Sequence, residues 1–238
     1  MWVLIDYDNV DLIERQRGVS WVVHRILQTI TPSYFTDGQQ VQIRLYGGWY
    51  LGDAHSRLAQ DLSAEISIDF PKPIEIFNDE KKIRVRTNAK LALSTLSDPS
   101  RFLFHTYRTR GFPGGVKCFD PPFESCQDPS NCPLELLHGF LSSKTCPSDE
   151  CTIKPKNILY RVEQKMVDSM IVADIIHISL NEITAAIVSS DDDLWPGIRM
   201  ALNQGLTLHH IHPRRGQDSL SFYRDPAPTN YHEYSLFQ

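Results

Sequence analysis

Two short apolar segments near the ends of the chain constrain the fold more than any other feature. Residues 2–6 (WVLID) and 184–188 (TAAIV) are apolar at almost every position, and acidic residues follow both. A strand that is apolar on both faces is typical of a parallel sheet buried between helices. Apolar residues recur at helical spacing over 19–30 and 161–180. The sequence therefore predicts an α/β fold with a parallel sheet covered by helices.

The rest of the chain extends this alternation around one irregular stretch. We expect further extended segments over 41–46, 74–77, 82–93 and 206–211, and further helices over 53–66 and 194–204. Residues 111–155 contain seven prolines and all five cysteines but few aliphatic residues. We therefore predict a Cys- and Pro-rich insertion within a single domain of residues 1–238. Residues 213–238 predict an extended C-terminal arm that stacks on bases or packs on the domain.

The charge balance limits the classes of partner. The 238 residues include 24 Lys and Arg against 29 Asp and Glu, a net charge of -5. This balance excludes a simple basic coat for nucleic acid, but not an enzyme whose own carboxylates hold metal ions. The apolar runs are much shorter than the roughly 18 residues that span a bilayer, and Asp6 and Asp8 interrupt the apolar start. We expect a cytoplasmic protein without membrane contact.

Acidic side chains directly follow two of the predicted strands. Asp6 and Asp8 lie at the end of the first strand, Asp191 follows 184–188, and Asp168 lies early in the preceding helix. Ligands of parallel sheets bind at the carboxyl ends of the strands, so these acids are expected to converge. Mg²⁺ or Mn²⁺ would relieve their repulsion and can activate water for phosphodiester hydrolysis. A single aspartate more often caps a turn or faces solvent, but three converging acidic groups favour a metal site.

Four ordered blocks of the sequence resemble a known family. VLIDYDNV opens the chain, RLYGGWY follows at 44–50, EQKMVDSMIVADI at 163–175, and IVSSDDDLWPGIRMALNQGLTLHHI at 187–211. Together they cover about half of the chain and resemble the NYN domain, the nuclease branch of the PIN-like superfamily. Ser190 stands where that family usually has Gly, and Leu194 where it usually has Phe. The Cys- and Pro-rich segment has no counterpart in the family core.

This resemblance implies a fold, an activity and a set of site residues. The fold would be a three-layer, Rossmann-like PIN/NYN fold with a mostly parallel central sheet. The activity would be that of a metal-dependent endonuclease acting on RNA in preference to DNA, with Mg²⁺ or Mn²⁺. Metal binding and catalysis would fall to Asp6, Asp168, Asp191 and Asp193. Asn9 would support Asp6 or contact substrate, and Lys165 would bind substrate. Asp174 lies six residues after Asp168, about 600° around a helix, and is expected to face away from it.

Two other functions fit parts of the same sequence. The run Asp6-Tyr7-Asp8-Asn9-Val10 also matches the D-x-D-x-[TV] opening of haloacid-dehalogenase-like phosphatases. Asp6 would then be a nucleophile and Asp8 a general acid. This alternative leaves the Val-Asp helix and the Pro and Gly after the acids unexplained. A non-catalytic NYN module that binds RNA or protein is the third alternative, and a homodimer is open in each case.

The cysteines offer a second, structural metal site. Four of the five, with or without His138, have the donor chemistry of a Zn²⁺ site that would give the insertion a shape. The five are Cys118, Cys126, Cys132, Cys146 and Cys151. Their spacing contains no C-x-x-C pair, and free thiols or a fortuitous disulfide are the alternatives.

Basic residues suggest where a phosphate backbone would bind. Lys82, Arg84 and Arg86 alternate along a predicted strand and would line one face of it. A solvated strand face that discourages edge pairing is the alternative. His210 and His212 would also share a face of their strand, where we expect a surface or core-edge role rather than metal binding.

Overall fold

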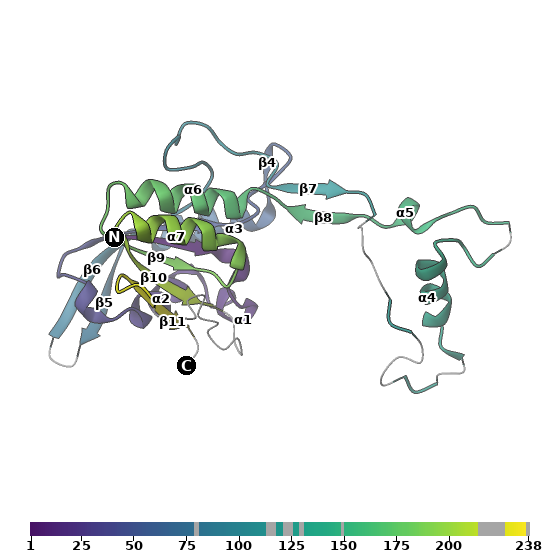
Figure 1. Ribbon diagram of the computed structural model, residues 1–238, viewed down its shortest axis with the longest axis horizontal. Helices are drawn as coiled ribbons and strands as arrows, with labels where there is room; N and C mark the ends of the chain where they lie inside the picture. Colours follow the sequence, from purple (N-terminus) through teal and green to yellow (C-terminus); the bar gives the residue numbers. More distant parts are fainter. Residues whose placement is uncertain are drawn as a thin grey trace. The chain divides into compact units, whose positions relative to one another are not determined.

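The computed structural model describes residues 1–78, 81–112, 118–120, 126–128, 131–148, 150–213 and 227–236. The chain divides into two compact units, and Figure 1 shows the elements of both. Unit 1 comprises Met1–Tyr107 and Gln164–Gln238, and unit 2 comprises Arg108–Glu163. The predicted insertion over 111–155 therefore lies within unit 2.

A mixed seven-stranded sheet forms the centre of unit 1. Its strands are β1 (Trp2–Asp6), β2 (Gln40–Tyr46), β5 (Lys72–Asn78), β6 (Lys81–Leu91), β9 (Thr184–Val188), β10 (Thr207–His212) and β11 (Tyr231–Ser235). They follow the order β11-β10-β9-β1-β2-β6-β5. Neighbours from β11 to β6 pair in parallel, whereas β5 pairs antiparallel with β6. The prediction of an α/β fold is confirmed.

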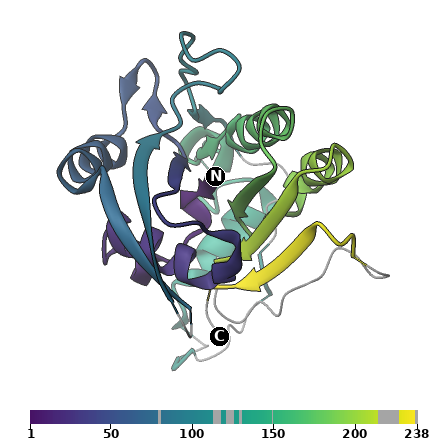
Figure 2. The same ribbon diagram turned by 90° about the vertical axis from the view of Figure 1, so that its left-hand side faces the viewer.

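Helices pack against both faces of this sheet. The long ones are α2 (Val19–Thr29), α3 (Arg57–Asp69), α6 (Val167–Ser179) and α7 (Trp195–Asn203). Val3 and Ile5 of β1 pack into the core under α2 and α3, whereas Leu4 packs into the core under α6 and α7. Figure 2 shows α6 and α7 in green beside one face of the sheet and β11 in yellow at its edge. Burial on both faces explains why β1 is apolar at successive positions.

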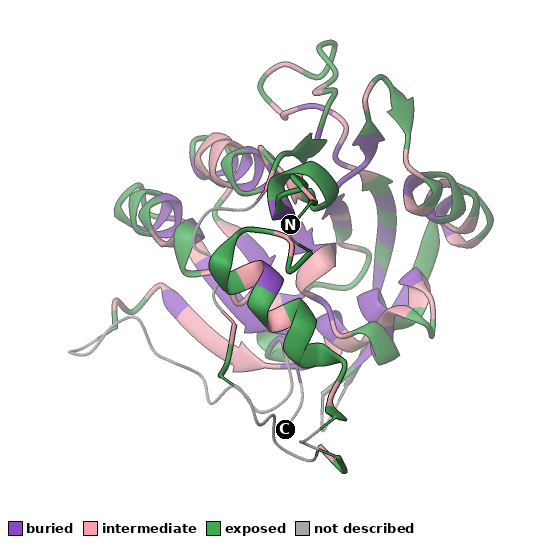
Figure 3. Cartoon of the chain, turned by 90° about the vertical axis from the view of Figure 1, so that its right-hand side faces the viewer, coloured by how far each residue is buried: buried purple, intermediate pink, exposed green. Residues whose placement is uncertain are grey.

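Short elements complete the two units. They are η1 (Tyr7–Asn9), α1 (Leu12–Arg15), η2 (Pro32–Tyr34), β3 (Tyr50–Leu51), β4 (Ala54–His55), β7 (Tyr107–Arg110), α4 (Leu134–Ser143), α5 (Pro155–Ile158), β8 (Arg161–Gln164) and η4 (Asp192–Leu194). A second sheet has the order β4-β3-β7-β8. In unit 2 most of α4 is exposed, and Leu134, Leu136 and Leu137 face solvent, as the green colouring of this helix in Figure 3 shows. No helix within the described ranges has the length and apolar character needed to cross a membrane.

Two predicted elements differ from the observed ones for local reasons. The helix expected over 161–180 begins only at Val167. Met166 has a φ of +71°, which a right-handed helix does not accommodate, and the Lys165 amide donates to the Thr106 carbonyl at 2.8 Å. The described part of the expected C-terminal arm includes β11, which pairs with β10 in the main sheet. The remainder of that arm, 214–226 and 237–238, lies outside the described residues.

Candidate active site

Acidic side chains from three separate segments surround one cleft in unit 1. Since β1 and β9 are parallel neighbours with Ile5 opposite Val188, their carboxyl ends meet at the same edge of the sheet. Asp6 ends β1, Asp191 lies three residues beyond β9, and Asp168 lies in the first turn of α6. The cleft has a volume of about 240 Å³ and is lined by Asp6, Asp8, Asn9, Gln164, Val167, Asp168 and Asp191.

Two hydrogen bonds fix the orientation of the Asp6 carboxylate. The side chain is 3% exposed, and its Oδ2 accepts from the Asn9 amide and from the Ser189 hydroxyl, the latter at 3.0 Å. The Ser189 hydroxyl in turn accepts from the backbone amide of Asp191 at 3.1 Å. Within the described ranges no donor is bound to Oδ1 of Asp6. One oxygen is therefore used for positioning, and the other is left to meet a ligand in the cleft.

Burial, together with the charges of neighbouring carboxylates, raises the affinity of the acidic side chains for protons. The pKa of Asp6 rises from 3.8 to about 6, mainly through burial and further through the charges of Asp168 and Asp8, against the two hydrogen bonds. The pKa of Asp168 is also raised, first by partial loss of water and then by Asp191 and Asp193. A bound cation would remove this repulsion, so the electrostatics of the cleft favour a positive ligand.

Asp8 connects the first loop to the turn after β2. Its Oδ2 accepts from the Gly48 amide at 3.3 Å, and Arg15 lies 3.5 Å from its Oδ1. Gly48 must lack a side chain, because a Cβ there would lie 2.1 Å from Cε2 of the Tyr107 ring. The Gln164 side chain also bonds to Asp8, and burial nevertheless raises the pKa of this carboxyl. The backbone amide and Arg15 thus hold Asp8 at the rim of the cleft.

The donor set of the cleft suits a hydrated hard cation. All of its charged donors are carboxylate oxygens, which Mg²⁺ and Mn²⁺ prefer. Among the described residues, no three of these carboxylates have oxygen atoms within 4.8 Å of one another. Mg²⁺ usually keeps several of its waters and binds one or two carboxylates directly, so it does not need three carboxylates within contact of one another. Asp6, Asp168 and Asp191 are the residues that would hold it.

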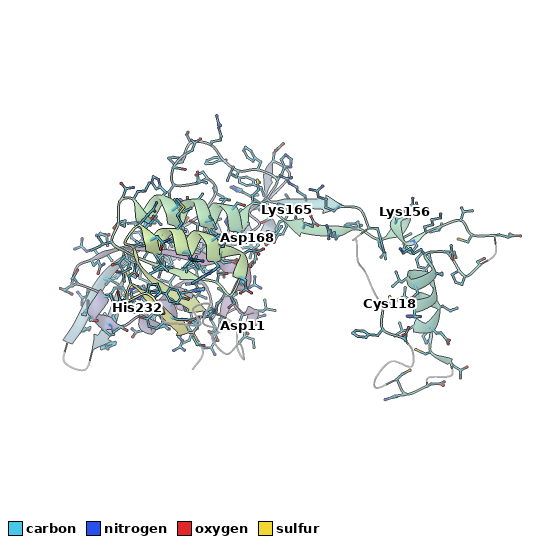
Figure 4. The ribbon with its side chains drawn as sticks, in the orientation of Figure 1. Asp11, Cys118, Lys156, Lys165, Asp168 and His232 are labelled. Carbon is cyan, nitrogen blue, oxygen red and sulfur yellow. The ribbon has the colours of Figure 1, made fainter. Side chains whose placement is uncertain are left out.

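The structure brings two further predicted residues close to the cleft. Asp193 is exposed and is absent from the cleft lining, but its charge acts on Asp168 and its amide donates to Oδ1 of Asp191 at 3.0 Å. The positive charge of Lys165 partly opposes the rise in the pKa of Asp168 that burial, Asp191 and Asp193 cause. Figure 4 shows the labelled side chains of Lys165 and Asp168 at the same end of α6. Asp168 thus lies between acidic neighbours and one cation.

The predicted basic stripe does not reach this edge of the sheet. Arg86 pairs with Gln40, the first residue of β2, whereas Asp6 pairs with Tyr46, the last residue. Lys82 and Arg84 precede Arg86 in β6 and form ion pairs with Glu75 at 2.7 Å and 3.2 Å. The three cations therefore lie toward the opposite end of the sheet, separated from Asp6 by about six residues of strand, or roughly 20 Å.

Asp174, unlike the acids of the cleft, lies in the core and forms bonds that stabilise the fold. It is fully buried and forms an ion pair with Arg44 at 3.2 Å. It also accepts from the Tyr46 hydroxyl at 2.5 Å and from the Leu96 amide at 2.6 Å. These partners occupy its carboxylate and stabilise the junction of α6 with β2, and Asp174 is not among the residues that line the cleft.

The five cysteines are free thiols of intermediate exposure in unit 2. They are Cys118, Cys126, Cys132, Cys146 and Cys151. In the described part of the chain, no three of them gather closely enough to share an ion, with or without His138. The zinc site in the insertion stays a prediction from composition.

Sequence reasoning missed two residues whose side chains bond to the acids of the cleft. Ser189 connects Asp6 to the Asp191 amide, and Gln164 bonds to Asp8. The position of Ser189 directly after a buried strand and before the acidic run could have indicated its role, because a hydroxyl there lies at the end of the strand, where the acids meet. Gln164 had no such signal, since its position depends on β8 ending where the sequence pattern predicts helix.

No family model and no solved structure matches the chain. The sequence is similar to uncharacterized protein y4oD of Sinorhizobium fredii (strain NBRC 101917 / NGR234), with 35% identity over 72 residues. The match covers 29% of this chain and 34% of the relative, so the chain spans about a third of that protein.

Proposed function

We propose that this protein is a metal-dependent endonuclease that hydrolyses phosphodiester bonds, in RNA rather than DNA, and that it has a three-layer, mostly parallel fold of the NYN type. The observation that carries the proposal is the cleft in which Asp6, Asp168 and Asp191 meet from three segments. A buried carboxylate with a pKa of about 6, oriented by two donors, is unusual for a purely structural aspartate and typical of a functional site.

Each residue has a distinct part in this proposal. Asp6, Asp168 and Asp191 hold Mg²⁺ or Mn²⁺, with Asp193 adding negative charge. A bound ion would supply activation of water and neutralisation of the charge on the scissile phosphate. Asn9 and Ser189 keep Oδ2 of Asp6 occupied, so that Oδ1 faces the ligand.

The positive charge of Lys165 beside Asp168 supports a second part of the proposal. An ammonium group at this place can bind the phosphate next to the cleaved bond, independent of base sequence. Because the stripe of Lys82, Arg84 and Arg86 lies toward the other end of the sheet, we assign it no contact with the reacting phosphate. We therefore expect a short oligonucleotide to suffice as substrate.

A cleavage assay tests the function directly. End-labelled RNA and DNA oligonucleotides are incubated with the purified protein and Mg²⁺ or Mn²⁺, alongside Asp6→Asn and Asp191→Asn. Asp192→Asn is the matched control, since Asp192 is exposed and does not line the cleft. We expect metal-dependent internal cleavage of RNA by the wild type and the control, with loss in the two cleft variants. Equal cleavage by all four proteins would overturn the site assignment.

The same samples distinguish the rival functions. A phosphatase would form an acyl-phosphate on Asp6 and hydrolyse small phosphomonoesters. A non-catalytic module would bind RNA without cutting it, and Asp191→Asn would leave that behaviour unchanged. We expect neither a phosphoenzyme nor uncut bound RNA in the presence of metal.

A further inference from the structure

A second group of metal-ligating side chains lies on the two strands at one edge of the sheet. His210 and His212 of β10 and Glu233 of β11 can each bring one nitrogen or oxygen atom within 4.8 Å of the others. His210 lies directly opposite Glu233 in the parallel pairing, and His212 lies two residues further on the same face. His210 is fully buried, and the side chains of His212 and Glu233 are 6% and 15% exposed. The pairing register of β10 with β11 therefore brings His210, His212 and Glu233 close together.

The hydrogen bonds of His210 present a lone pair on one ring nitrogen. Its Nε2 lies 3.0 Å from the Ser189 carbonyl oxygen, which can only accept, so Nε2 carries the hydrogen. Its Nδ1 therefore carries a lone pair, which accepts from the Tyr231 hydroxyl at 2.9 Å, and a metal ion bound at Nδ1 would take the place of this hydrogen bond. A neutral imidazole whose N–H is held by a backbone carbonyl is the usual arrangement of a metal-binding histidine.

The other two side chains are already in contact. Nε2 of His212 lies 2.8 Å from Oε1 of Glu233, so a proton lies between two atoms that both bind transition metals. A cation that replaces this proton needs the two atoms to separate by only a few tenths of an ångström, since tetrahedral ligands about 2 Å from an ion lie roughly 3.3 Å apart. Among the described residues, His210, His212 and Glu233 are the three whose ligand atoms lie within 4.8 Å of one another. No three carboxylates of the cleft come this close together.

We propose that His210, His212 and Glu233 form a binding site for Zn²⁺ or a similar divalent transition metal. Two imidazoles and one carboxylate form a donor set that such ions favour over Mg²⁺. The site is separate from the acidic cleft in its residues and in its ion, and it does not depend on the proposed nuclease activity. Sequence alone favoured a surface or core-edge role for these histidines, because it did not reveal that Glu233 lies opposite His210.

The metal would connect β11 to the rest of the sheet. β11 is an edge strand that pairs with β10, and Glu233 is its ligand in the proposed site. Through the Ser189 carbonyl, His210 also contacts the segment whose hydroxyl holds Asp6. Binding therefore stabilises the edge of the sheet, and the apparent melting temperature should rise with Zn²⁺.

Zn²⁺ titration of tag-free, chelator-treated protein in excess Mg²⁺ tests the proposal. The variants are His212→Gln and Glu233→Gln, each checked for fold by circular dichroism. His232→Gln is the matched control, since His232 lies between Tyr231 and Glu233 on β11 and binds the Tyr34 hydroxyl on the opposite face. Asp191→Asn controls for the acidic cleft.

We expect one Zn²⁺ per chain to bind to the wild type, to His232→Gln and to Asp191→Asn. The variants His212→Gln and Glu233→Gln should bind this ion at least tenfold more weakly. The melting temperature should rise with Zn²⁺ only in the first group. Co²⁺ in place of Zn²⁺ should give visible absorption without an intense thiolate band. Absence of Zn²⁺ binding by the wild type, an unchanged Zn²⁺ affinity in His212→Gln, as for an ion held by cysteines, or loss of binding in Asp191→Asn would each overturn the proposal.

Discussion

Replacing Asp6 by Asn should stabilise the metal-free protein, and by an amount that depends on pH. The folded state raises the pKa of Asp6 from 3.8 to about 6, so it disfavours the charged carboxylate. At about 1.4 kcal/mol per pKa unit, the charge costs the folded state about 3 kcal/mol above pH 6. Asn9 and Ser189 can still donate to the amide oxygen of the variant, so most of this cost should be recovered.

The variant is the more stable protein at neutral pH because Asp6 releases its proton at a lower pH in the unfolded state than in the folded state. Below pH 3.8 Asp6 is protonated in both states, and wild type and variant should differ little in this respect. As pH rises from 3.8 to 6, the unfolded state ionises first, and the wild type loses stability that Asp6→Asn does not lose. The advantage of the variant should therefore grow from about 1 kcal/mol at pH 4.5 to about 3 kcal/mol at pH 7.5.

Urea unfolding followed by circular dichroism, with EDTA present, measures this difference. The informative quantity is the change of about 2 kcal/mol between pH 4.5 and pH 7.5, because constant effects of the substitution cancel. Asp192→Asn, at an exposed site, serves as the control and should show no such trend. A stability difference for Asp6→Asn that stays constant over this range would refute the argument that burial and neighbouring carboxylates disfavour the charged form of Asp6.

Three other substitutions test separate parts of the structure. Asp174→Ala should cost about 3–5 kcal/mol in urea unfolding, because it leaves Arg44 buried without its partner. Gly48→Ala should cost about 1–3 kcal/mol, because the new Cβ meets the Tyr107 ring at 2.1 Å, and a thermal melt would show it. Asn9→Ala should lower the rate of RNA cleavage roughly 10- to 100-fold with the fold unchanged by circular dichroism, because Oδ2 of Asp6 loses a donor.

The sequence predicted the centre of the fold because the signals there are local. Residues 2–6 and 184–188 are apolar on both faces, and the structure places them as adjacent parallel strands with helices on each side. The acids after these strands follow directly from that placement, which is why Asp6 and Asp191 could be expected at one edge.

The other features of the fold and the site could not be predicted, because they depend on contacts between residues far apart in the sequence. The start of α6 is set by Met166 and by the bond from Lys165 to Thr106, which no periodicity reveals. The basic residues of β6 alternate as predicted, but the register of β6 against β2 directs them toward the end of the sheet opposite Asp6. The contact of Glu233 with His212 likewise depends on the pairing of β11 with β10.

The central claim is that Asp6, Asp168 and Asp191 act together as a metal-binding cleavage site. The most direct test is the rate of Mn²⁺-dependent cleavage of one labelled RNA by Asp191→Asn and by its neighbour Asp192→Asn. We predict that Asp191→Asn is slowed roughly 100-fold or more, whereas Asp192→Asn stays close to the wild-type rate. Equal rates for the two variants, or cleavage that persists in EDTA, would contradict the account.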